Sequence, residues 1–316
     1  MNQGVKHRLK IAVIGAGVFG GYHANKCAAH PRADFVGIYD RNISRAKLQA
    51  EKHGVKAFDN FQSMLAQTDA VIIASPAKSH GAMALTALEF GKHCLIEKPI
   101  ASSAKEAARI IQLAKDRNLI VQTGHQERFV AKAIGLHRLP QTPLNIVARR
   151  MSKFSKRGTD VSVTLDLMTH DLDLVLMLMS GLPIEVRGET RIEKSEYPDF
   201  TKGDLRFENG TATLTASRLE DDFSRTMDIT YPSGTVSIDF NAKTLTHNTP
   251  FDLNADFGQD PDAKDSLGAA TNAFIEAVLD GKAVPVTAED GYNALKIALV
   301  IDGPESGEVI WEKRES

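Results

Sequence analysis

A stretch of mostly apolar residues in the second half of the chain carries polar groups of the types that acid–base chemistry needs. It reads Leu165-Asp166-Leu167-Met168-Thr169-His170-Asp171-Leu172-Asp173-Leu174. At about 100° per residue of a helix, four polar residues fall within one arc of roughly 100°: Asp166, Thr169, His170 and Asp173. Burying such a stripe unpaired costs several kcal/mol, so we expect it to face a solvent-filled cleft.

Asp166 and His170 lie four residues apart and can touch on such a helix. A carboxylate beside an imidazole raises its basicity and orients the ring, as a proton acceptor requires. The alternative is a structural Asp–His pair at a domain interface. A metal site is not predicted, because one histidine without nearby cysteines leaves too few ligands.

Two further motifs follow predicted strands in the first third of the chain. One is Glu97-Lys98-Pro99, and the other is Ser75-Pro76 followed by His80. A lysine before a proline is held in an extended backbone, here with a candidate cis bond, and we expect Lys98 to point into a ligand cleft. The alternatives are a surface lysine beside a turn and, for His80, a helix residue with a local hydrogen bond.

The glycine loop Gly15-Ala16-Gly17-Val18-Phe19-Gly20 follows an apolar strand and opens a helix. Glycines there permit a tight turn and the close approach of backbone N–H groups to a pyrophosphate. Asp40, twenty residues past Gly20, can accept hydrogen bonds from both ribose hydroxyls, which favours NAD. Arg41 can instead hold a 2′-phosphate, so NADP is the less favoured cofactor. The alternative is a glycine turn in an unliganded sheet.

Alternating strands and helices position these motifs between residue 9 and about residue 124. The predicted strands are Leu9–Ile14, Phe35–Tyr39, Ala70–Ala74, His93–Glu97 and Ile120–Thr123, and the predicted helices lie near 18–30, 42–53, 78–90 and 103–117. Such alternation is typical of a doubly wound parallel sheet. We therefore predict a Rossmann dinucleotide-binding domain over 1–124.

A different pattern follows and predicts a second α/β domain over 125–316. We expect helices near 127–138, 164–180, 267–280 and 287–301, and strands near 144–150, 184–192, 204–218, 223–231 and 234–240. Asn209-Gly210 and Pro232-Ser233-Gly234 are strong turn signals between strands. They indicate a mostly antiparallel, open sheet. Residues 251–265, with five aspartates, are expected to be a solvated loop.

Composition excludes several functional classes. The 316 residues carry a formal net charge of −2, so no basic field attracts nucleic acid or an anionic membrane, and a small-molecule partner is expected. Two cysteines, Cys27 and Cys94, make no disulfide framework and fit a reducing compartment. No segment approaches the roughly 18 apolar residues of a membrane helix. We expect a cytoplasmic enzyme.

The glycine loop, Glu97-Lys98-Pro99 and Asp166-x-x-x-His170, in this order, resemble the Gfo/Idh/MocA family of oxidoreductases. Ser75-Pro76 with His80 looks like the strand-four motif of that family, and the stretch from Gly124 to Phe129 looks like its strand-six motif. The resemblance covers essentially the whole chain. It implies a dinucleotide domain plus an α/β domain whose open sheet makes subunit contacts, in a homodimer or homotetramer.

The resemblance also implies residue roles. Lys98, Asp166 and His170 match the catalytic lysine, aspartate and histidine of the family. Hydride would pass between a substrate carbinol carbon and the nicotinamide, with the hydroxyl proton taken by His170 or Lys98. The resemblance also implies cofactor contacts for the glycine loop and for Asp40, Arg41, Ser75, Pro76, His80, Glu97, Lys98 and Gln126. Gln126 stands at a position where the family commonly has an asparagine.

The run from Arg149 to Arg157 holds five basic residues and no acid. With the helix that follows, it looks most like the branch of the family that acts on the 3-hydroxyl of UDP-N-acetylglucosamine. Arg149, Lys153 and Arg157 could hold a diphosphate beside the catalytic residues. The alternative is a solvated basic loop.

Two other functions fit the same motifs. A dehydrogenase of a free polyol or monosaccharide such as inositol needs Lys98, Asp166 and His170 but no phosphate-binding group. A non-catalytic dinucleotide-binding sensor needs only the Rossmann fold, because that fold does not prove catalysis. The three catalytic matches argue against the sensor.

Overall fold

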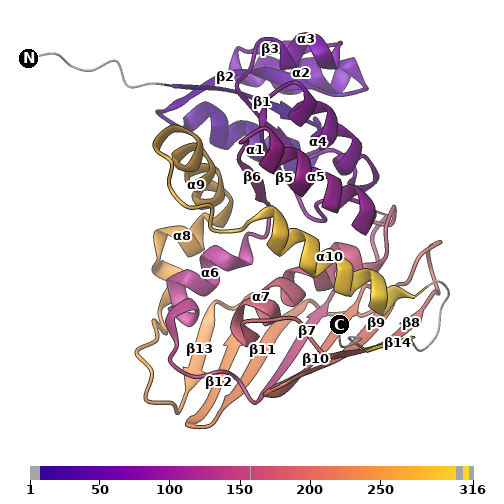
Figure 1. Ribbon diagram of the computed structural model, residues 1–316, viewed down its shortest axis with the longest axis vertical. Helices are drawn as coiled ribbons and strands as arrows, with labels where there is room; N and C mark the ends of the chain where they lie inside the picture. The colour runs from indigo at the N-terminus through magenta and orange to yellow at the C-terminus, as the bar shows by residue number, and fades with distance from the viewer. Residues whose placement is uncertain (1–7, 157, 304–308, 313–316) are drawn as a thin grey trace, which may run out of the picture. The chain divides into compact units, whose positions relative to one another are not determined.

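The structure is a computed structural model that describes residues 8–156, 158–303 and 309–312. It divides into two compact units (Figure 1). The first consists of Met1–Gly124 with Leu267–Tyr292, and the second of His125–Ser266 with Asn293–Ser316. The division after Gly124 coincides with the predicted one. The return of a later segment to the first unit was not predicted.

The first unit is a parallel sheet with helices on both faces (Figure 1). The strand order is β3-β2-β1-β4-β5-β6. The strands are β1 Leu9–Ile14, β2 Ala33–Tyr39, β3 Lys56–Phe58, β4 Ala70–Ile73, β5 His93–Ile96 and β6 Val121–Thr123. The helices are α1 Val18–Ala29, α2 Ile43–His53, α3 Phe61–Leu65, α4 His80–Glu89 and α5 Ala104–Asp116. In this doubly wound order the direction of winding changes between β1 and β4, and sheets of this kind bind ligands at the carboxyl ends of those strands.

Every strand and helix predicted for 9–124 is present, and the predicted fold class is confirmed. Sequence analysis missed β3 and α3, because segments of three and five residues carry no readable periodicity. A short 3₁₀ turn, Ala77–Ser79, precedes α4.

Helix α9, Ser266–Asp280, completes the core of the first unit. Phe274 and Ile275 are fully buried in the same cluster as Ile11 and Val13 of β1. The Gln122 side chain also donates to the carbonyl oxygen of Ala270 at 2.9 Å. The first unit therefore differs from the predicted 1–124 by Leu267–Tyr292, because apolar residues of α9 belong to the core of the parallel sheet.

The second unit is built on a mixed sheet in the order β13-β12-β11-β7-β10-β9-β8-β14. Its strands are β7 Asn145–Met151, β8 Glu185–Arg191, β9 Phe200–Phe207, β10 Gly210–Ser217, β11 Ser224–Tyr231, β12 Gly234–Asp239, β13 Thr244–His247 and β14 Val309–Glu312. Neighbouring strands are antiparallel except β7 and β10, which are parallel. The expected mostly antiparallel sheet is confirmed.

Helices α6, Glu127–Ile134, and α7, Thr169–Met179, lie on one side of this sheet (Figure 1). Strand residues alternate accordingly: in β7, Ile146, Ala148 and Arg150 are buried and Arg149 is exposed. The helix-covered face therefore carries the core of this unit. The other face carries exposed side chains.

The predicted helix 164–180 is not one uniform α-helix. Thr164–Met168 forms a π-helical turn, and α7 continues from Thr169. A π turn inserts extra residues into the helical repeat and often lies at a functional site. The angles expected for the polar stripe therefore do not hold across residues 164–168.

Residues 251–265 were expected to be a solvated loop, and this is only partly right. Asp260 caps the short helix α8, Pro261–Lys264, through hydrogen bonds from the Asp262 and Ala263 N–H groups. Phe251 and Phe257 are buried. Within the described ranges, no helix is both long and apolar enough to cross a lipid bilayer.

Candidate active site

The glycine loop packs against the end of β4 in the first unit. Gly15 has φ +106°, and a Cβ there would lie 2.5 Å from the carbonyl oxygen of Ala74. A Cβ on Gly20 would collide with the carbonyl oxygen of Gly15. Glycine is thus required at both positions by the turn itself, and the backbone of the loop comes close to the carboxyl end of the sheet.

Gly17 differs from these two glycines, because a Cβ built on it would meet nothing within 4 Å. Gly17 is the N-cap of α1, and no side chain caps this helix. Val18 and Phe19, the first helical residues, are exposed. Open space before an uncapped helix N-terminus suits a pyrophosphate, which backbone N–H groups and the helix dipole attract.

Asp40 lies at the end of β2, beside the glycine loop. Its carboxylate accepts hydrogen bonds from the Ala16 N–H at 2.7 Å and from the Asn42 N–H at 2.8 Å. The side chain remains half-buried, so solvent or a ribose can still reach it. Arg41 is exposed. The role in ribose binding that the sequence predicted for Asp40 stays a prediction.

Glu97, Lys98 and Pro99 follow β5 at the same end of the sheet, and the Lys98–Pro99 bond is cis. Glu97 is buried and its carboxylate lies 2.8 Å from Nε2 of His23. Burial alone would raise the pKa of Glu97, but His23, Lys98 and His80 together hold it below its ordinary value. Glu97 is therefore a buried anion that fixes the backbone beside Lys98, which is half-buried.

Sequence analysis missed His23, which lies three residues after Gly20 on α1. A histidine on a helix of small and apolar residues was the available signal, and it was not used. His23 is fully buried and joins α1 to the residue after β5.

His80 is buried, and both of its ring nitrogens lie close to backbone carbonyl oxygens. Nδ1 is 2.7 Å from the oxygen of Pro99, and Nε2 is 2.8 Å from the oxygen of Ser75. The Ser75 hydroxyl lies 2.8 Å from that of Ser79. The ring thus joins the segments after β4 and β5. This geometry favours the local, structural alternative for His80 over a direct cofactor contact.

In the second unit, Asp166 lies in the π turn and His170 is the second residue of α7; both are half-buried. A Cβ on Gly158, which has φ +77°, would collide with the Asp166 carboxylate. The His125 ring is buried and meets the His170 ring edge-on, with centroids 6.3 Å apart. Sequence analysis quoted His125 in a motif but assigned it no role. Gln126, the next residue, precedes α6 and is half-buried.

Two buried ion pairs anchor α7. The Arg150 guanidinium donates to both oxygens of Asp171, at 2.8 and 3.0 Å, and to Glu127 at 3.2 Å. Arg128 donates to both oxygens of Asp173, at 2.6 and 2.8 Å. The expectation that the whole polar stripe faces a cleft is therefore wrong for Asp173, which is fully buried and paired.

Thr169 is buried as well, and its hydroxyl donates to the carbonyl oxygen of Leu165 at 3.0 Å. Of the four stripe residues, only Asp166 and His170 keep surface that a ligand could reach.

The basic run from 149 to 157 does not act as one surface. Arg150 is buried in its ion pair, and Arg149 points to the opposite face of β7, away from α7. Lys153 lies beyond the end of β7 and is exposed. Arg157 lies outside the described residues. Successive residues of a strand point to opposite faces of the sheet, so Arg149 and Arg150 lie on opposite sides. A count of basic residues in the sequence does not show this difference.

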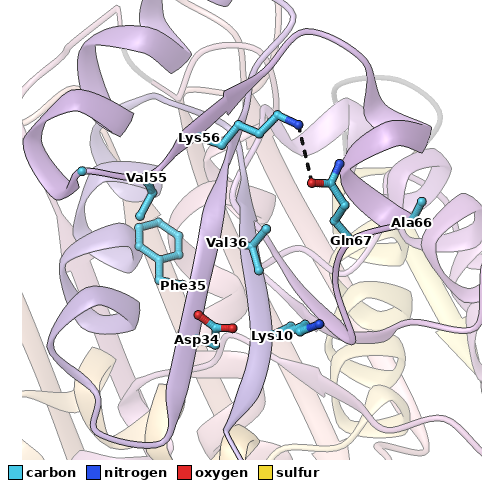
Figure 2. Close-up of a pocket in the computed structure, with 9 residues that line it drawn as sticks. Lys10, Asp34, Phe35, Val36, Val55, Lys56, Ala66 and Gln67 are labelled. Atoms are coloured by element: carbon cyan, nitrogen blue, oxygen red, sulfur yellow. Dashed lines mark hydrogen bonds between the residues drawn. The ribbon is translucent and has the colours of Figure 1, made fainter.

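A hollow of about 580 Å³ in the first unit lies elsewhere. Figure 2 shows Lys10 and Asp34 at one end of it and Lys56, whose Nζ donates to Gln67 at 3.5 Å, at the other. These residues come from the beginnings of β1, β2 and β3. Doubly wound sheets bind their ligands at the carboxyl ends of strands, so this hollow is not the dinucleotide site. Among the described residues, no three acidic, histidine or cysteine side chains are arranged to hold a metal ion.

Comparison with protein families assigns both parts of the chain. Residues 9–125 match a model described as an oxidoreductase family with an NAD-binding Rossmann fold. Residues 136–237 match the GFO/IDH/MocA C-terminal domain.

One relative is similar over nearly the full length. UDP-N-acetylglucosamine 3-dehydrogenase of Acidithiobacillus ferrooxidans is 33% identical over 303 residues, which cover 93% of this chain and 96% of that protein. A solved structure of that enzyme matches with a TM-score of 0.84 and 31% identity, over 93% of this chain and 97% of that one.

Two other proteins are similar either over part of the chain or at low identity. The scyllo-inositol 2-dehydrogenase of Bacillus subtilis is 33% identical, but over only 40% of this chain and 38% of that protein. The WlbA dehydrogenase of Bordetella pertussis, solved with NADH and UDP-GlcNAcA, has a TM-score of 0.83 over 97% of this chain and 99% of that one. At 17% identity it demonstrates the shared fold alone.

Proposed function

Because the chain belongs to the Gfo/Idh/MocA family and is an NAD-dependent sugar oxidoreductase, we propose that it oxidises the 3-hydroxyl of UDP-N-acetylglucosamine to a ketone. The observation that carries this proposal is the 33% identity to an enzyme of that activity over 93% of the chain. The inositol alternative has weaker support, because the scyllo-inositol 2-dehydrogenase is similar over 40% of the chain and a solved putative myo-inositol dehydrogenase of Sinorhizobium meliloti, which covers 92% of the chain, is only 20% identical.

The first unit has the features that a dinucleotide needs. The glycine loop leaves open space at Gly17 and is rigid at Gly15 and Gly20. Asp40 presents a carboxylate that is tied to the loop backbone and half-buried, which favours a ribose with a free 2′-hydroxyl and so NAD over NADP. Bound NAD supplies the hydride acceptor.

The residues of the chain have the chemistry for the proton side of the reaction. We assign His170 as the group that takes the proton of the 3-hydroxyl, held by its contact with the His125 ring. Asp166 orients His170 or accepts a hydrogen bond from a sugar hydroxyl. Lys98, beside the buried Glu97 anion, presents an ammonium that lowers the pKa of the reacting hydroxyl. As the O–H proton leaves, the C3–H bond breaks with its electron pair and the ketone forms.

A spectrophotometric assay tests the proposal. Purified protein with NAD is given UDP-N-acetylglucosamine, free N-acetylglucosamine and myo-inositol, and reduced nicotinamide is followed by absorbance. We expect reduction with the nucleotide sugar. His170→Ala and Lys98→Ala should each lower kcat at least about a hundredfold, while Lys243→Ala, an exposed turn residue, should not.

The opposite results identify the alternatives. Turnover of myo-inositol without turnover of the nucleotide sugar would establish the polyol dehydrogenase. Thermal stabilisation by NAD without reduction by any sugar of a broad panel would establish the sensor. Full activity in His170→Ala and Lys98→Ala would overturn the residue assignment.

A further inference from the structure

Arg225 lies on the helix-covered face of the second-unit sheet, at the edge where the π turn begins. It is the second residue of β11, in register with Arg150 of β7. Met227 and Ile229, two and four residues further along the strand, are buried in the core on that face. Arg225 itself is exposed. The strand therefore directs this guanidinium to the same side as α7, and not to the open face where Arg149 lies.

The surroundings of Arg225 are charged. Partial loss of water lowers its pKa first, and Arg150 lowers it further, whereas Glu127, Asp171 and Asp166 raise it. A guanidinium remains protonated through such shifts. Arg225 is therefore a permanent cation that interacts electrostatically with Asp166, the aspartate assigned to the reaction.

Arg225 differs from the other two arginines of this region in its bonding. Arg150 and Arg218 are buried and donate to carboxylates and carbonyl oxygens through hydrogen bonds of 2.7 to 3.2 Å. Within the part of the chain that the structure describes, no hydrogen bond or ion pair involves the side chain of Arg225. Its planar set of N–H donors is thus exposed and partly desolvated, and it interacts electrostatically with Asp166.

A phosphate is the ligand that best matches this group. Guanidinium binds phosphate oxygens in a bidentate manner, and a partly desolvated guanidinium binds them more strongly than one in bulk water. Lys153, exposed just beyond the end of β7, lies at the same edge of the sheet, because β7 and β11 are antiparallel and Met151 pairs with Ser224. Asp166 lies at this end as well, because its carboxylate meets Gly158, whose carbonyl oxygen accepts a hydrogen bond from Arg218 just past β10, and Ser217 of β10 pairs with Met151.

We propose that Arg225 binds the diphosphate of the nucleotide-sugar substrate and so places the sugar at Asp166 and His170. This inference rests on the proposed function. It assigns the binding of the substrate diphosphate to Arg225, which lies outside the basic run 149–157. Arg225 is then the residue that distinguishes a nucleotide sugar from a free sugar.

Steady-state kinetics and binding test this role with three variants. Arg225→Ala removes the cation, Arg225→Lys keeps the charge without the bidentate geometry, and Arg187→Ala removes an exposed arginine from the open face of the same sheet. In Arg225→Ala we expect KM for UDP-N-acetylglucosamine and Kd for UDP to rise about ten- to a hundredfold, with kcat and KM for NAD changed less than threefold. Arg225→Lys should recover part of this loss. Arg187→Ala should match wild type.

Binding of UDP and of inorganic pyrophosphate, measured by calorimetry, does not depend on turnover. Loss of both affinities in a folded Arg225→Ala protein, with partial recovery in Arg225→Lys, supports the inference even if the sugar specificity differs from the one proposed. Wild-type affinities for UDP and pyrophosphate in Arg225→Ala overturn it, although the proposed function would stand. Failure of wild type to bind UDP overturns the inference, and failure to oxidise the nucleotide sugar overturns the proposed function.

Discussion

The three glycines of the glycine loop differ in whether the fold itself requires a glycine. Gly15 needs a positive φ and space against Ala74, and Gly20 needs space against the Gly15 carbonyl. Gly17 needs neither for folding, because a Cβ there would touch no protein atom within 4 Å. The only demand left on Gly17 is close approach by a ligand.

This difference gives the first prediction. Gly17→Ala should leave the melting temperature unchanged and raise the Kd for NAD at least about tenfold, because the added methyl occupies the space of the pyrophosphate. Gly20→Ala should lower the melting temperature itself. Thermal melts with and without NAD separate the two effects. Unaltered NAD affinity in Gly17→Ala would place the dinucleotide elsewhere.

The buried pair of His23 and Glu97 gives the second prediction. His23→Leu should destabilise the protein by about 3–5 kcal/mol, because it removes the imidazole that lies 2.8 Å from the buried Glu97 carboxylate. The double variant His23→Leu/Glu97→Leu should recover much of this loss, since replacing both partners removes the buried charge. Urea unfolding measures both. A double variant as unstable as the single one would mean that packing, and not charge, is the cause.

At the scale of elements, one buried arginine holds the chain segment that precedes the π turn. Arg218, the residue after β10, is buried and donates to the carbonyl oxygens of Gly158 at 2.8 Å and Val161 at 3.2 Å, in the segment just before Asp166. Its Nε donates to Asp199 at 2.7 Å. Asp199 thus holds the Arg218 guanidinium in position.

The third prediction concerns acid stability. Burial would raise the pKa of Asp199, but N–H groups of Lys194 and Glu193 and the Arg218 guanidinium hold it well below its ordinary value. A carboxylate with a depressed pKa stabilises the fold above its unfolded pKa of about 4, and that stabilisation is lost as the pH falls below it.

Asp199→Asn should therefore cost about 3–5 kcal/mol at pH 7, and the difference from wild type should shrink steadily below pH 4. Unfolding by urea at a series of pH values measures it. Asp228→Asn, at an exposed position of β11, serves as the control. A difference that is independent of pH would mean that Asp199 acts through packing alone.

The elements show where sequence-based prediction succeeds and where it stops. Long periodic helices and β-branched strands were predictable, because 3.6- and 2-residue repeats are visible in a single sequence. The π turn at Thr164–Met168 was not, since the same residues are compatible with a regular α-helix. Arg150 appeared as part of a basic surface, but the alternation of β7 turns it to the helix-covered face, where it donates to the buried Asp171 of α7.

The candidate site follows the same division. The sequence singles out Gly15, Gly17, Gly20, Asp40 and Lys98 as candidates, because their motifs are local and follow strands that the structure has. Arg225 was not, because its importance depends on the pairing of β11 with β7 and on which face of the sheet α7 covers. These contacts join segments that are far apart in the sequence, and a single sequence does not show which segments pair.

At the scale of the whole molecule, the first unit depends on a segment far along the chain. Phe274 and Ile275 are fully buried in the core that β1 and β2 share. The predicted boundary at residue 124 missed this, because helical periodicity indicates an apolar face but not which sheet it covers.

The fourth prediction follows from this dependence. Phe274→Ala should destabilise the first unit by about 3–5 kcal/mol and weaken NAD binding, although Phe274 lies on a helix distant in sequence from the glycine loop. Phe90→Ala, which removes an exposed ring of the same unit, should change stability by less than about 0.5 kcal/mol. Calorimetric unfolding with and without NAD is the measurement. Equal stability of both variants would contradict the placement of α9 in this core.

The position of α9 in the sequence also bears on when the first unit can complete its core during synthesis on the ribosome. Synthesis supplies about 5–20 residues per second, and amino-terminal domains commonly fold while the rest is still being made. Here the strands of the dinucleotide-binding unit are complete once Thr123 has emerged, but the helix that seals their core ends only at Asp280. The segment that forms most of the other unit is translated during this interval. The apolar residues that α9 covers therefore gain this last partner only after most of the other unit has been translated.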